Sequence, residues 1–301
     1  MRTSPRPILI VIVLCASALV GFKVTTSAQQ TGGSRERALF VSAVDKDGEP
    51  VTGLEPDAFI VREDGVRREV LRVSRATEPI DIAVLIDNST AASDEITFFR
   101  EALSKFVAKI GPGNHVALIA LADRPTILVD YTNDPKRLSD AVGRLFPMPQ
   151  SGMTLLDAVL ETSQGLGRRE TPRAVIVPVI TDGIEFTNRY SVDVVKALER
   201  ADAALHAVTI GQFSYREEHG IRERSFFLSN GPAKSGGQQI TLLSPHGLDQ
   251  ALQRLARELS SQYKVIYGRP QSTIPPERTE VSSAKTGVTM RGTPARGESG
   301  A

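Results

Sequence analysis

Between residues 80 and 259 the sequence alternates short apolar runs with stretches in which apolar residues recur every three or four positions. Continuous apolar runs are typical of strands buried on both faces, whereas the wider spacing is typical of amphipathic helices. The predicted strands are 80–86, 115–121, 125–129, 174–180, 205–210 and 238–242. The predicted helices are 93–110, 135–145, 155–165, 191–203, 222–230 and 248–259. This alternation predicts a doubly wound α/β fold, in which helices cover both faces of a mostly parallel sheet.

Two residues inside this pattern carry their own expectations. Ser93 precedes the first helical stretch and is predicted to cap it, because a serine hydroxyl can accept a hydrogen bond from a free N–H group of the first turn. Pro178 lies within a predicted core strand, although a proline there removes one hydrogen-bond donor from the ladder.

The segments on either side of the α/β pattern differ from it. Residues 35–78 contain short β-prone runs separated by turn residues, which predicts a small module of three or so antiparallel strands. The α/β unit is predicted at 79–268. After it, 269–301 is predicted as an extended tail in which 277–281 and 288–291 could form strands against the module, with the last ten residues disordered.

The first 28 residues have the pattern of a secretory signal peptide. Arg2 and Arg6 form a short basic region, residues 8–14 are apolar, and small residues at 26–28 offer a cleavage site. The sequence therefore predicts export to the periplasm or the medium. An uncleaved membrane anchor is the alternative, since the apolar character continues to Phe22, but this is short of the roughly 20 residues that a spanning helix needs. Membrane contact is predicted only through this segment.

Composition narrows the classes of function. The single cysteine, Cys15, lies inside the predicted signal, so the mature chain can form neither a disulfide nor a thiolate metal site. The signal also holds three of the 36 basic residues, which leaves the mature chain close to neutral beside 35 acidic residues. With no basic run, no nucleic-acid partner is expected. The absence of tryptophan argues against a stacking platform for sugars.

Oxygen-bearing side chains cluster where predicted strands end. The run from Asp87 to Ala91 follows the first core strand, Thr181-Asp182-Gly183 follows the strand at 174–180, and a turn at 151–157 contains Thr154. Ligands of parallel α/β sheets bind at the carboxyl ends of the strands. We therefore expect these three loops to meet at one edge of the sheet, where their hard oxygen atoms suit a divalent cation.

These three loops resemble the metal-ion-dependent adhesion site (MIDAS) of von Willebrand factor A (VWA) domains, in which an Asp-x-Ser-x-Ser loop, a threonine loop and a Thr-Asp-Gly loop surround one divalent cation. The flanking runs at 51–54, 57–59 and 262–267 extend the resemblance to an exported VWA-related family abundant in acidobacteria. The resemblance covers roughly residues 38–295. It implies a Rossmann-like VWA fold and a domain that binds a partner protein.

The resemblance also implies the residues of the site. Four residues match the family's cation ligands: Asp87, Ser89, Thr154 and Asp182. Mg²⁺ prefers about six oxygen ligands, one of which a partner's carboxylate could supply. Ala91 stands where the pattern has a second serine, so metal affinity is expected to be weakened or lost unless a water or Ser93 replaces that hydroxyl. Three neighbours are predicted to contact the partner: Asn88, Thr90 and Asp157.

Signs of catalysis are few. The four histidines have no zinc spacing, and neither a Gly-x-Ser-x-Gly elbow nor a phosphate-binding loop occurs. Two carboxylates at one sheet edge could support metal-assisted hydrolysis, but no obvious general base or nucleophile accompanies them. The sequence therefore predicts a protein that is not an enzyme, with a metal-assisted hydrolase as the least favoured alternative.

The favoured function is an exported, adhesion-type module with a degenerate MIDAS. It would bind an exported or envelope protein, with an acidic side chain of that partner completing the coordination of Mg²⁺. The alternative is a metal-free structural scaffold of the envelope, in which the site is vestigial and contacts come from the β module or the loop 212–224.

Overall fold

The computed structural model describes residues 35–169, 171–211, 218–270, 274 and 276–296. The signal segment predicted at 1–28 and residues 212–217 of the predicted loop 212–224 lie outside these residues, and 219–224 of that loop form the start of a helix. Among the helices that are described, none has both the length and the apolarity required to span a membrane.

A six-stranded sheet forms the centre of the α/β unit, in the order β10-β9-β8-β5-β6-β7. Its strands are β5 (Ile80–Ile86), β6 (His115–Ala120), β7 (Thr126–Thr132), β8 (Arg173–Thr181), β9 (Ala203–Ile210) and β10 (Gln238–Leu242). All neighbouring pairs are parallel except β6 with β7, which is antiparallel and closes one edge. The predicted α/β fold with a mostly parallel sheet is therefore confirmed.

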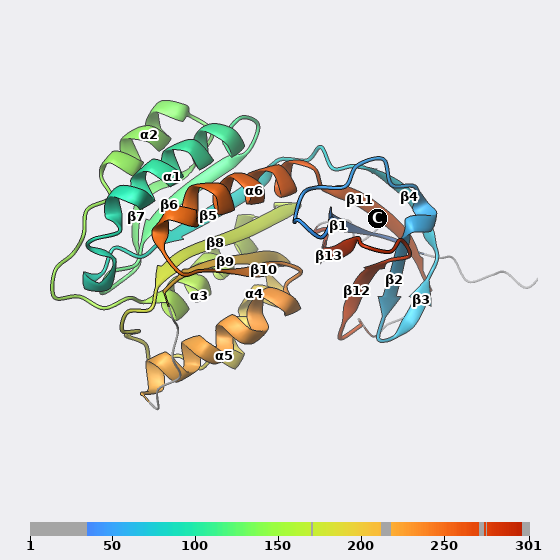
Figure 1. Cartoon of the computed structure of the whole chain (residues 1–301). Helices are drawn as coiled ribbons and strands as arrows, with labels where there is room; N and C mark the ends of the chain where they lie inside the picture. Colours follow the sequence, from blue (N-terminus) through green and yellow to red (C-terminus); the bar gives the residue numbers. More distant parts are fainter. Residues whose placement is uncertain (1–34, 170, 212–217, 271–273, 275, 297–301) are drawn as a thin grey trace, which may run out of the picture.

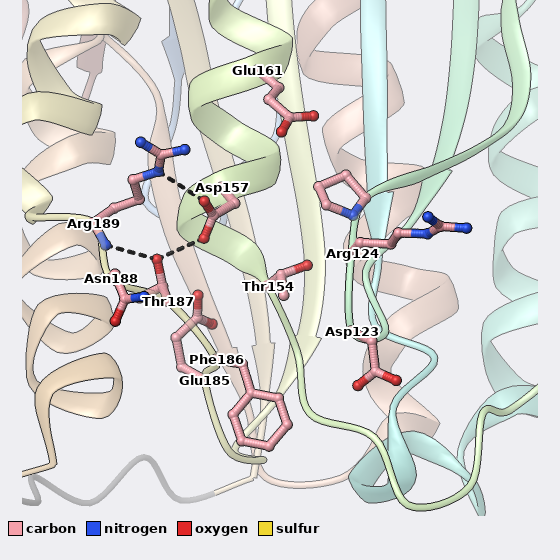
Figure 2. A pocket seen from close by; sticks show the side chains of 11 residues that line it. Asp123, Arg124, Thr154, Asp157, Glu161, Glu185, Phe186, Thr187, Asn188 and Arg189 are labelled. Carbon is pink, nitrogen blue, oxygen red and sulfur yellow. Dashed lines mark hydrogen bonds and ion pairs between the residues drawn. The ribbon is translucent and has the colours of Figure 1, made fainter.

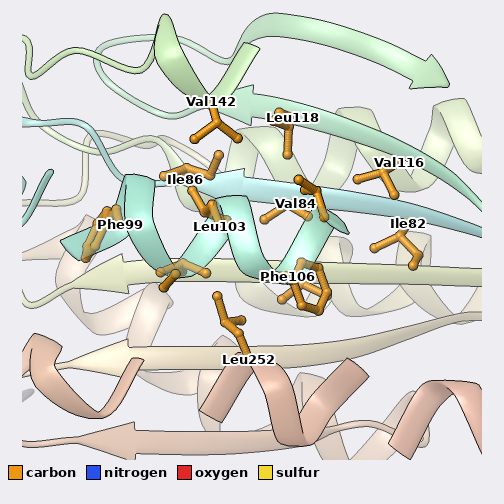
Figure 3. Close-up of a cluster of buried hydrophobic side chains, with 14 of the residues drawn as sticks. Ile82, Val84, Ile86, Phe99, Leu103, Phe106, Val116, Leu118, Val142 and Leu252 are labelled. Carbon is orange, nitrogen blue, oxygen red and sulfur yellow. The ribbon is translucent and has the colours of Figure 1, made fainter. Parts of the chain in front are cut away.

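Helices cover both faces of this sheet (Figure 1). One face carries α1 (Ile96–Ile110), α2 (Pro135–Gly143) and α6 (Leu248–Ser260). The other carries α3 (Leu155–Arg169), α4 (Ser191–Arg200) and α5 (His219–Lys234). Phe99, Leu103 and Phe106 of α1 lie over β5 and are completely buried (Figure 3). Each such side chain contributes about 1.5–3 kcal/mol relative to exposure.

The structure differs from the expected helices at two places. A short 3₁₀ turn, η2 (Thr90–Ala92), follows β5, and α1 begins only at Ile96 after Glu95, which makes no side-chain cap. The predicted cap at Ser93 is therefore wrong, because this residue ends the η2 turn and its N–H donates to Thr90 O at 3.2 Å. Helix α5 is longer than predicted because it continues through Gly231 and Pro232, residue types that usually end a helix.

Pro178 is accommodated inside β8, which lies between β5 and β9. The ladder to β9 pairs Ile176 with Leu205 and resumes at Val179 with Val208. The pairing to β9 is thus interrupted at the proline, while the ladder to β5 continues through Leu85.

A β module of two sheets lies beside the α/β unit. Its strands are β1 (Arg35–Val44), β2 (Phe59–Glu63), β3 (Val66–Arg68), β4 (Val70–Arg75), β11 (Tyr263–Arg269), β12 (Thr279–Ser283) and β13 (Thr289–Pro294). The sheet orders are β13-β1-β11-β4 and β12-β2-β3. The strand β11, which the sequence analysis assigned to the α/β unit, thus pairs within the module. The last strand reaches Pro294, so the expectation of disorder was wrong for residues 292–294; residues 297–301 lie outside the described part.

The module contacts the α/β unit at the amino end of the parallel strands. Arg173, the first residue of β8, packs its guanidinium group 5.1 Å from the ring centroid of Phe40 in β1. Arg291 of β13 pairs with Glu258 of α6 at 2.7 Å. The three predicted oxygen-bearing loops are therefore at the opposite end of the sheet from this junction (Figure 1).

Candidate functional site

Asp87 follows β5 directly and links it to the end of β8. Its side chain is completely buried. One carboxylate oxygen accepts a hydrogen bond from the N–H of Ser89 at 2.9 Å. The other accepts from the N–H of Thr181 at 3.1 Å and from its hydroxyl at 2.5 Å. The parallel register, in which Ile86 lies opposite Val179, brings these two strand ends together.

Ser89 presents a buried hydroxyl in the same loop. The residue is 1% exposed, and its Oγ has no hydrogen-bond partner among the described residues. Leaving such a group unsatisfied costs about 1–3 kcal/mol, which a cation or a water at this position would offset. The hydroxyl therefore fits the role of a metal ligand.

Ala91 lies against Gly183 of the third loop. A Cβ atom at Gly183 would come within 2.6 Å of the Ala91 Cβ and 3.6 Å of the Ser89 Oγ. Only glycine allows the two loops to approach so closely. The position that lacks a hydroxyl thus faces the same place as Ser89.

Thr154 immediately precedes α3 and is 4% exposed. Its hydroxyl donates to the carbonyl of Leu121 at 2.8 Å, and its N–H donates to the same oxygen at 3.0 Å. The Asn88 Oδ1 accepts from the N–H groups of Leu121 at 3.2 Å and Ala122 at 2.9 Å. The Asp87 loop and the Thr154 loop are thereby fastened to the same end of β6.

Asp182 is the most exposed of the four predicted ligands. Its carboxylate lies beside Gly211 at the end of β9, since a Cβ atom at Gly211 would be 3.1–3.3 Å from it. Within the described part of the chain, no group of three or more Asp, Glu, His or Cys side chains could hold a metal ion. A cation at this edge would therefore depend on the hydroxyl groups of Ser89 and Thr154 together with the two aspartates.

These loops fall within a recognised domain. A family model described as the von Willebrand factor type A domain matches residues 82–185, which contain all four predicted ligands. The chain contains a VWA domain. The family predicted from the three loops is thus confirmed, whereas membership of the exported acidobacterial group stays a prediction. A search of curated proteins gave no match.

Solved structures resemble the chain at low sequence identity. Proximal thread matrix protein 1 from the mussel byssus, with a zinc-occupied MIDAS motif, has a TM-score of 0.50 and 16% identity, covering 69% of this chain and 50% of that one. A von Willebrand factor type A protein from Catenulispora acidiphila gives 0.47 and 12%, covering 87% and 74%. The von Willebrand factor domain of a type V pilus tip protein from Porphyromonas gingivalis gives 0.44 and 13%, covering 60% and 95%. At such identities the likeness concerns the fold alone.

The three residues predicted to contact a partner lie in different surroundings. Asn88 is buried, and its Nδ2 donates to the carbonyl of Phe146 at 3.0 Å, so its side chain braces the loop. Thr90 is exposed, with its hydroxyl accepting from the N–H of Ser151 at 2.9 Å. Asp157 is partly exposed in an open cavity of about 790 Å³ (Figure 2). Contact of these residues with a partner stays a prediction.

Sequence reasoning gave no role to two residues of this edge, Thr181, which it named only as part of a loop, and Glu185. Thr181, which holds Asp87, could have been found from the parallel pairing of β5 with β8. Glu185 in the loop after β8 has no comparable signal. It is 4% exposed, its Oε1 accepts from the N–H of Leu156 at 3.0 Å, and its Oε2 has no hydrogen-bond partner among the described residues. Burial raises the pKa of Glu185 to about 8.

Exposed apolar side chains surround these polar loops. They are Phe146 (61%), Met148 (44%), Ile184 (53%) and Phe186 (52%). Two of them are tied to the Asp87 loop through Asn88, because the Phe146 carbonyl accepts from its amide and the Met148 N–H donates to its carbonyl at 2.7 Å. The ring of Phe186 lies over Gly152, where a Cβ atom would be 2.6 Å away. Exposed apolar groups gathered around polar ones are typical of a protein interaction surface.

Proposed function

We propose that the VWA domain binds a partner protein through the carboxyl edge of its parallel sheet. One observation carries the proposal: four large apolar side chains stand exposed around a buried, oxygen-rich centre at this edge. Burying such groups against a partner would supply the free energy of binding, and the polar centre would supply orientation. We further propose that the protein is exported, as its N-terminal sequence predicts, and that its partner is an exported or envelope protein.

A divalent cation has a place in this proposal. Asp87, Ser89, Thr154 and Asp182 would hold it, and the unpartnered Ser89 hydroxyl supports this assignment. Bound Mg²⁺ would supply a positive charge with an open coordination position for a carboxylate of the partner. The zinc in the MIDAS motif of the mussel byssus protein supports a metal of some kind here.

The alternative is partner binding without a metal. The Asp87 carboxylate already accepts three hydrogen bonds from its own chain, so the loop is held without a cation. Ala91 also removes one hydroxyl from the set that the family pattern requires. In either form the hydroxyl groups of Thr154 and Thr181 donate to groups of the chain itself, and we assign no catalytic step to them.

Capture of the partner by crosslinking from the native envelope tests the binding surface. We expect Phe146→Ser and Ile184→Ser each to reduce capture about tenfold, since burying one large apolar side chain contributes about 1.5–3 kcal/mol. Val66→Ser is the matched control, because Val66 is 55% exposed but lies in β3 of the module. Equal capture by all three variants would contradict the proposal. Capture that EDTA abolishes would favour the metal-dependent form, and capture indifferent to EDTA the metal-free form.

A further inference from the structure

An open cavity of about 790 Å³ adjoins Thr154 and extends along the first two turns of α3 (Figure 2). Four carboxyl groups line it, those of Asp123, Asp157, Glu161 and Glu185. Two basic residues also line it, Arg124 and Arg189. Asp123, Asp157 and Glu161 outnumber the two arginines even while Glu185 is protonated, and this excess of negative charge favours a cation.

Glu185 is the most informative of these acidic groups. Glu185 lines the cavity although it is only 4% exposed, and its buried Oε2 has no hydrogen-bond partner among the described residues. Burial raises the pKa of its carboxyl group most, and two charged residues also act on it: Arg224 of α5 lowers the pKa and Asp157 of α3 raises it. Burying a carboxyl oxygen without a partner is unfavourable, so a ligand that supplies a donor would be bound favourably at this point.

The cavity already holds one basic side chain of the protein itself. Arg189 donates from Nε to one oxygen of Asp157 at 2.8 Å, and the hydroxyl of Thr187 donates to the other at 2.6 Å. This pair shows how the wall binds a guanidinium group. Asp123, Glu161 and Glu185 share the rest of the lining with one further basic residue, Arg124.

Two more observations restrict the kind of cation that the cavity could bind. Phe186 lines the cavity and is 52% exposed, so its ring offers a surface to the aliphatic stem of a long side chain and to a cation above it. No three acidic, histidine or cysteine side chains in the described residues are grouped as a metal ion would require. A cation carried on an organic side chain therefore fits the cavity better than a second metal ion.

We propose that this cavity accepts a lysine or arginine side chain of the partner protein, with Glu185 as its principal acceptor. The inference rests on the proposed function, because the cavity adjoins the same edge of the sheet. The partner would then present a basic residue next to the acidic side chain that contacts the MIDAS loops.

The test is an NMR titration of the full, isotope-labelled chain with Nα-acetyl-lysine amide. Nα-acetyl-norleucine amide, which keeps the stem and lacks the ammonium group, is the matched probe. We expect saturable shifts of the amide signals of residues 154–161 and 185–189 with the lysine probe alone. Glu185→Gln should weaken binding about tenfold, since a bound ammonium group favours the ionised form of Glu185 and glutamine cannot carry that charge. Glu199→Gln, at an exposed position of α4 outside the cavity, should leave it unchanged.

Glutamine at 185 keeps an acceptor for the Leu156 N–H, so this variant should fold. Asp157→Asn is the second variant, and it should also weaken binding of the lysine probe. Equal shifts with the norleucine probe, or equal affinity in wild type and both variants, would overturn the inference. If the lysine probe fails while capture still depends on Phe146 and Ile184, the cavity assignment fails and the proposed surface stands. If capture is insensitive to those residues as well, the proposed function fails too.

Discussion

The two ends of the parallel sheet differ in which buried polar atoms lack a hydrogen-bond partner in the described residues: nitrogens at the amino end, and oxygens as well at the carboxyl end. At the amino end, Arg173 is 6% exposed, and its two terminal guanidinium nitrogens donate to the carbonyls of Glu78 at 2.6 Å and Leu259 at 2.9 Å and to the Gln262 side chain at 2.7 Å, while its Nε has no partner among the described residues. At the carboxyl end, the Ser89 hydroxyl and one Glu185 oxygen are buried without a partner among the described residues. The amino end joins two parts of one chain, and its groups serve stability.

This difference indicates that the carboxyl end of the sheet is the end suited to binding a ligand. Unsatisfied buried groups reduce stability, and a buried oxygen without a partner can accept a hydrogen bond or a cation from a ligand. The amino end also holds unpartnered nitrogens, because the Nε atoms of Arg173 and Arg291 and both ring nitrogens of His206 have no partner in the described residues. His206 has its pKa lowered to about 4 by burial. It is therefore neutral at pH 7 and adds no buried charge. The following variants test the contrast between the two ends.

The largest expected effect is the pH dependence contributed by Glu185. Its pKa is about 8 in the folded chain and near 4.5 when unfolded, so unfolding releases a proton between these values. Its carboxyl group is fully compatible with folding below pH 4.5 and increasingly destabilises the protein as pH rises towards 8. Glu185→Gln should therefore match wild type at about pH 4 and exceed its free energy of unfolding by about 4 kcal/mol at pH 8. Urea unfolding at both pH values measures this.

A constant difference between the two proteins across pH would mean that Glu185 is not buried as a neutral acid. Carboxyl groups elsewhere titrate equally in both proteins, so the comparison isolates this residue.

Arg173→Met tests the other end of the sheet. Methionine keeps much of the buried volume but leaves two carbonyls and the Gln262 side chain without their donor. We expect the free energy of unfolding to fall by about 3 kcal/mol, while the amide signals of residues 87–90 remain in place. Lys109→Met on the exposed side of α1 is the control, and it should change stability by less than about 0.5 kcal/mol. A loss no larger than that of the control would show that the junction contributes little.

The same two ends differ in how far the sequence predicts them. The strands that end just before Asp87 and at Thr181 are continuous apolar runs that can be recognised locally in the sequence. Parallel pairing of these strands is enough to bring their carboxyl ends to one edge of the sheet. The junction depends on pairing between distant segments: β11 lies between β1 and β4, and β13 beside β1. Nothing local in 263–269 distinguishes a strand of the module from one of the α/β sheet. Glu185 was missed for a related reason, since its burial arises from α3 and α5 packing over its loop.

Gly183→Ala sharpens the comparison at the carboxyl end. The added methyl group would meet the Ala91 Cβ at 2.6 Å, so the loops must separate. We expect a loss of about 2 kcal/mol in the free energy of unfolding, within the range for overpacking. Gly165→Ala is the matched control, because a Cβ there meets nothing within 4 Å inside α3. It should raise stability by about 0.5–1 kcal/mol. Similar effects of the two changes would contradict the close approach of the two loops.

The smallest expected effect concerns the metal. Ala91→Ser restores a hydroxyl beside Ser89, and calorimetric titration should give Mg²⁺ or Mn²⁺ affinity about tenfold higher, which corresponds to about 1.4 kcal/mol. Asp87→Ala should abolish uptake. Ser93→Ala is the control, because its hydroxyl follows the η2 turn and is not needed if position 91 is the missing ligand.

The pattern of heats separates the remaining possibilities. If Ser93→Ala abolishes uptake in the natural chain, Ser93 has replaced the missing ligand, and Ala91→Ser should then rescue it. If wild type, Asp87→Ala and Ala91→Ser give identical heats, no metal binds, and the unpartnered Ser89 hydroxyl must meet a water or a group of the partner instead. The binding surface around Phe146 and Ile184 would survive that result, since its apolar side chains do not depend on a cation. Partner binding would then be independent of a metal, and the difference between the two ends of the sheet would remain.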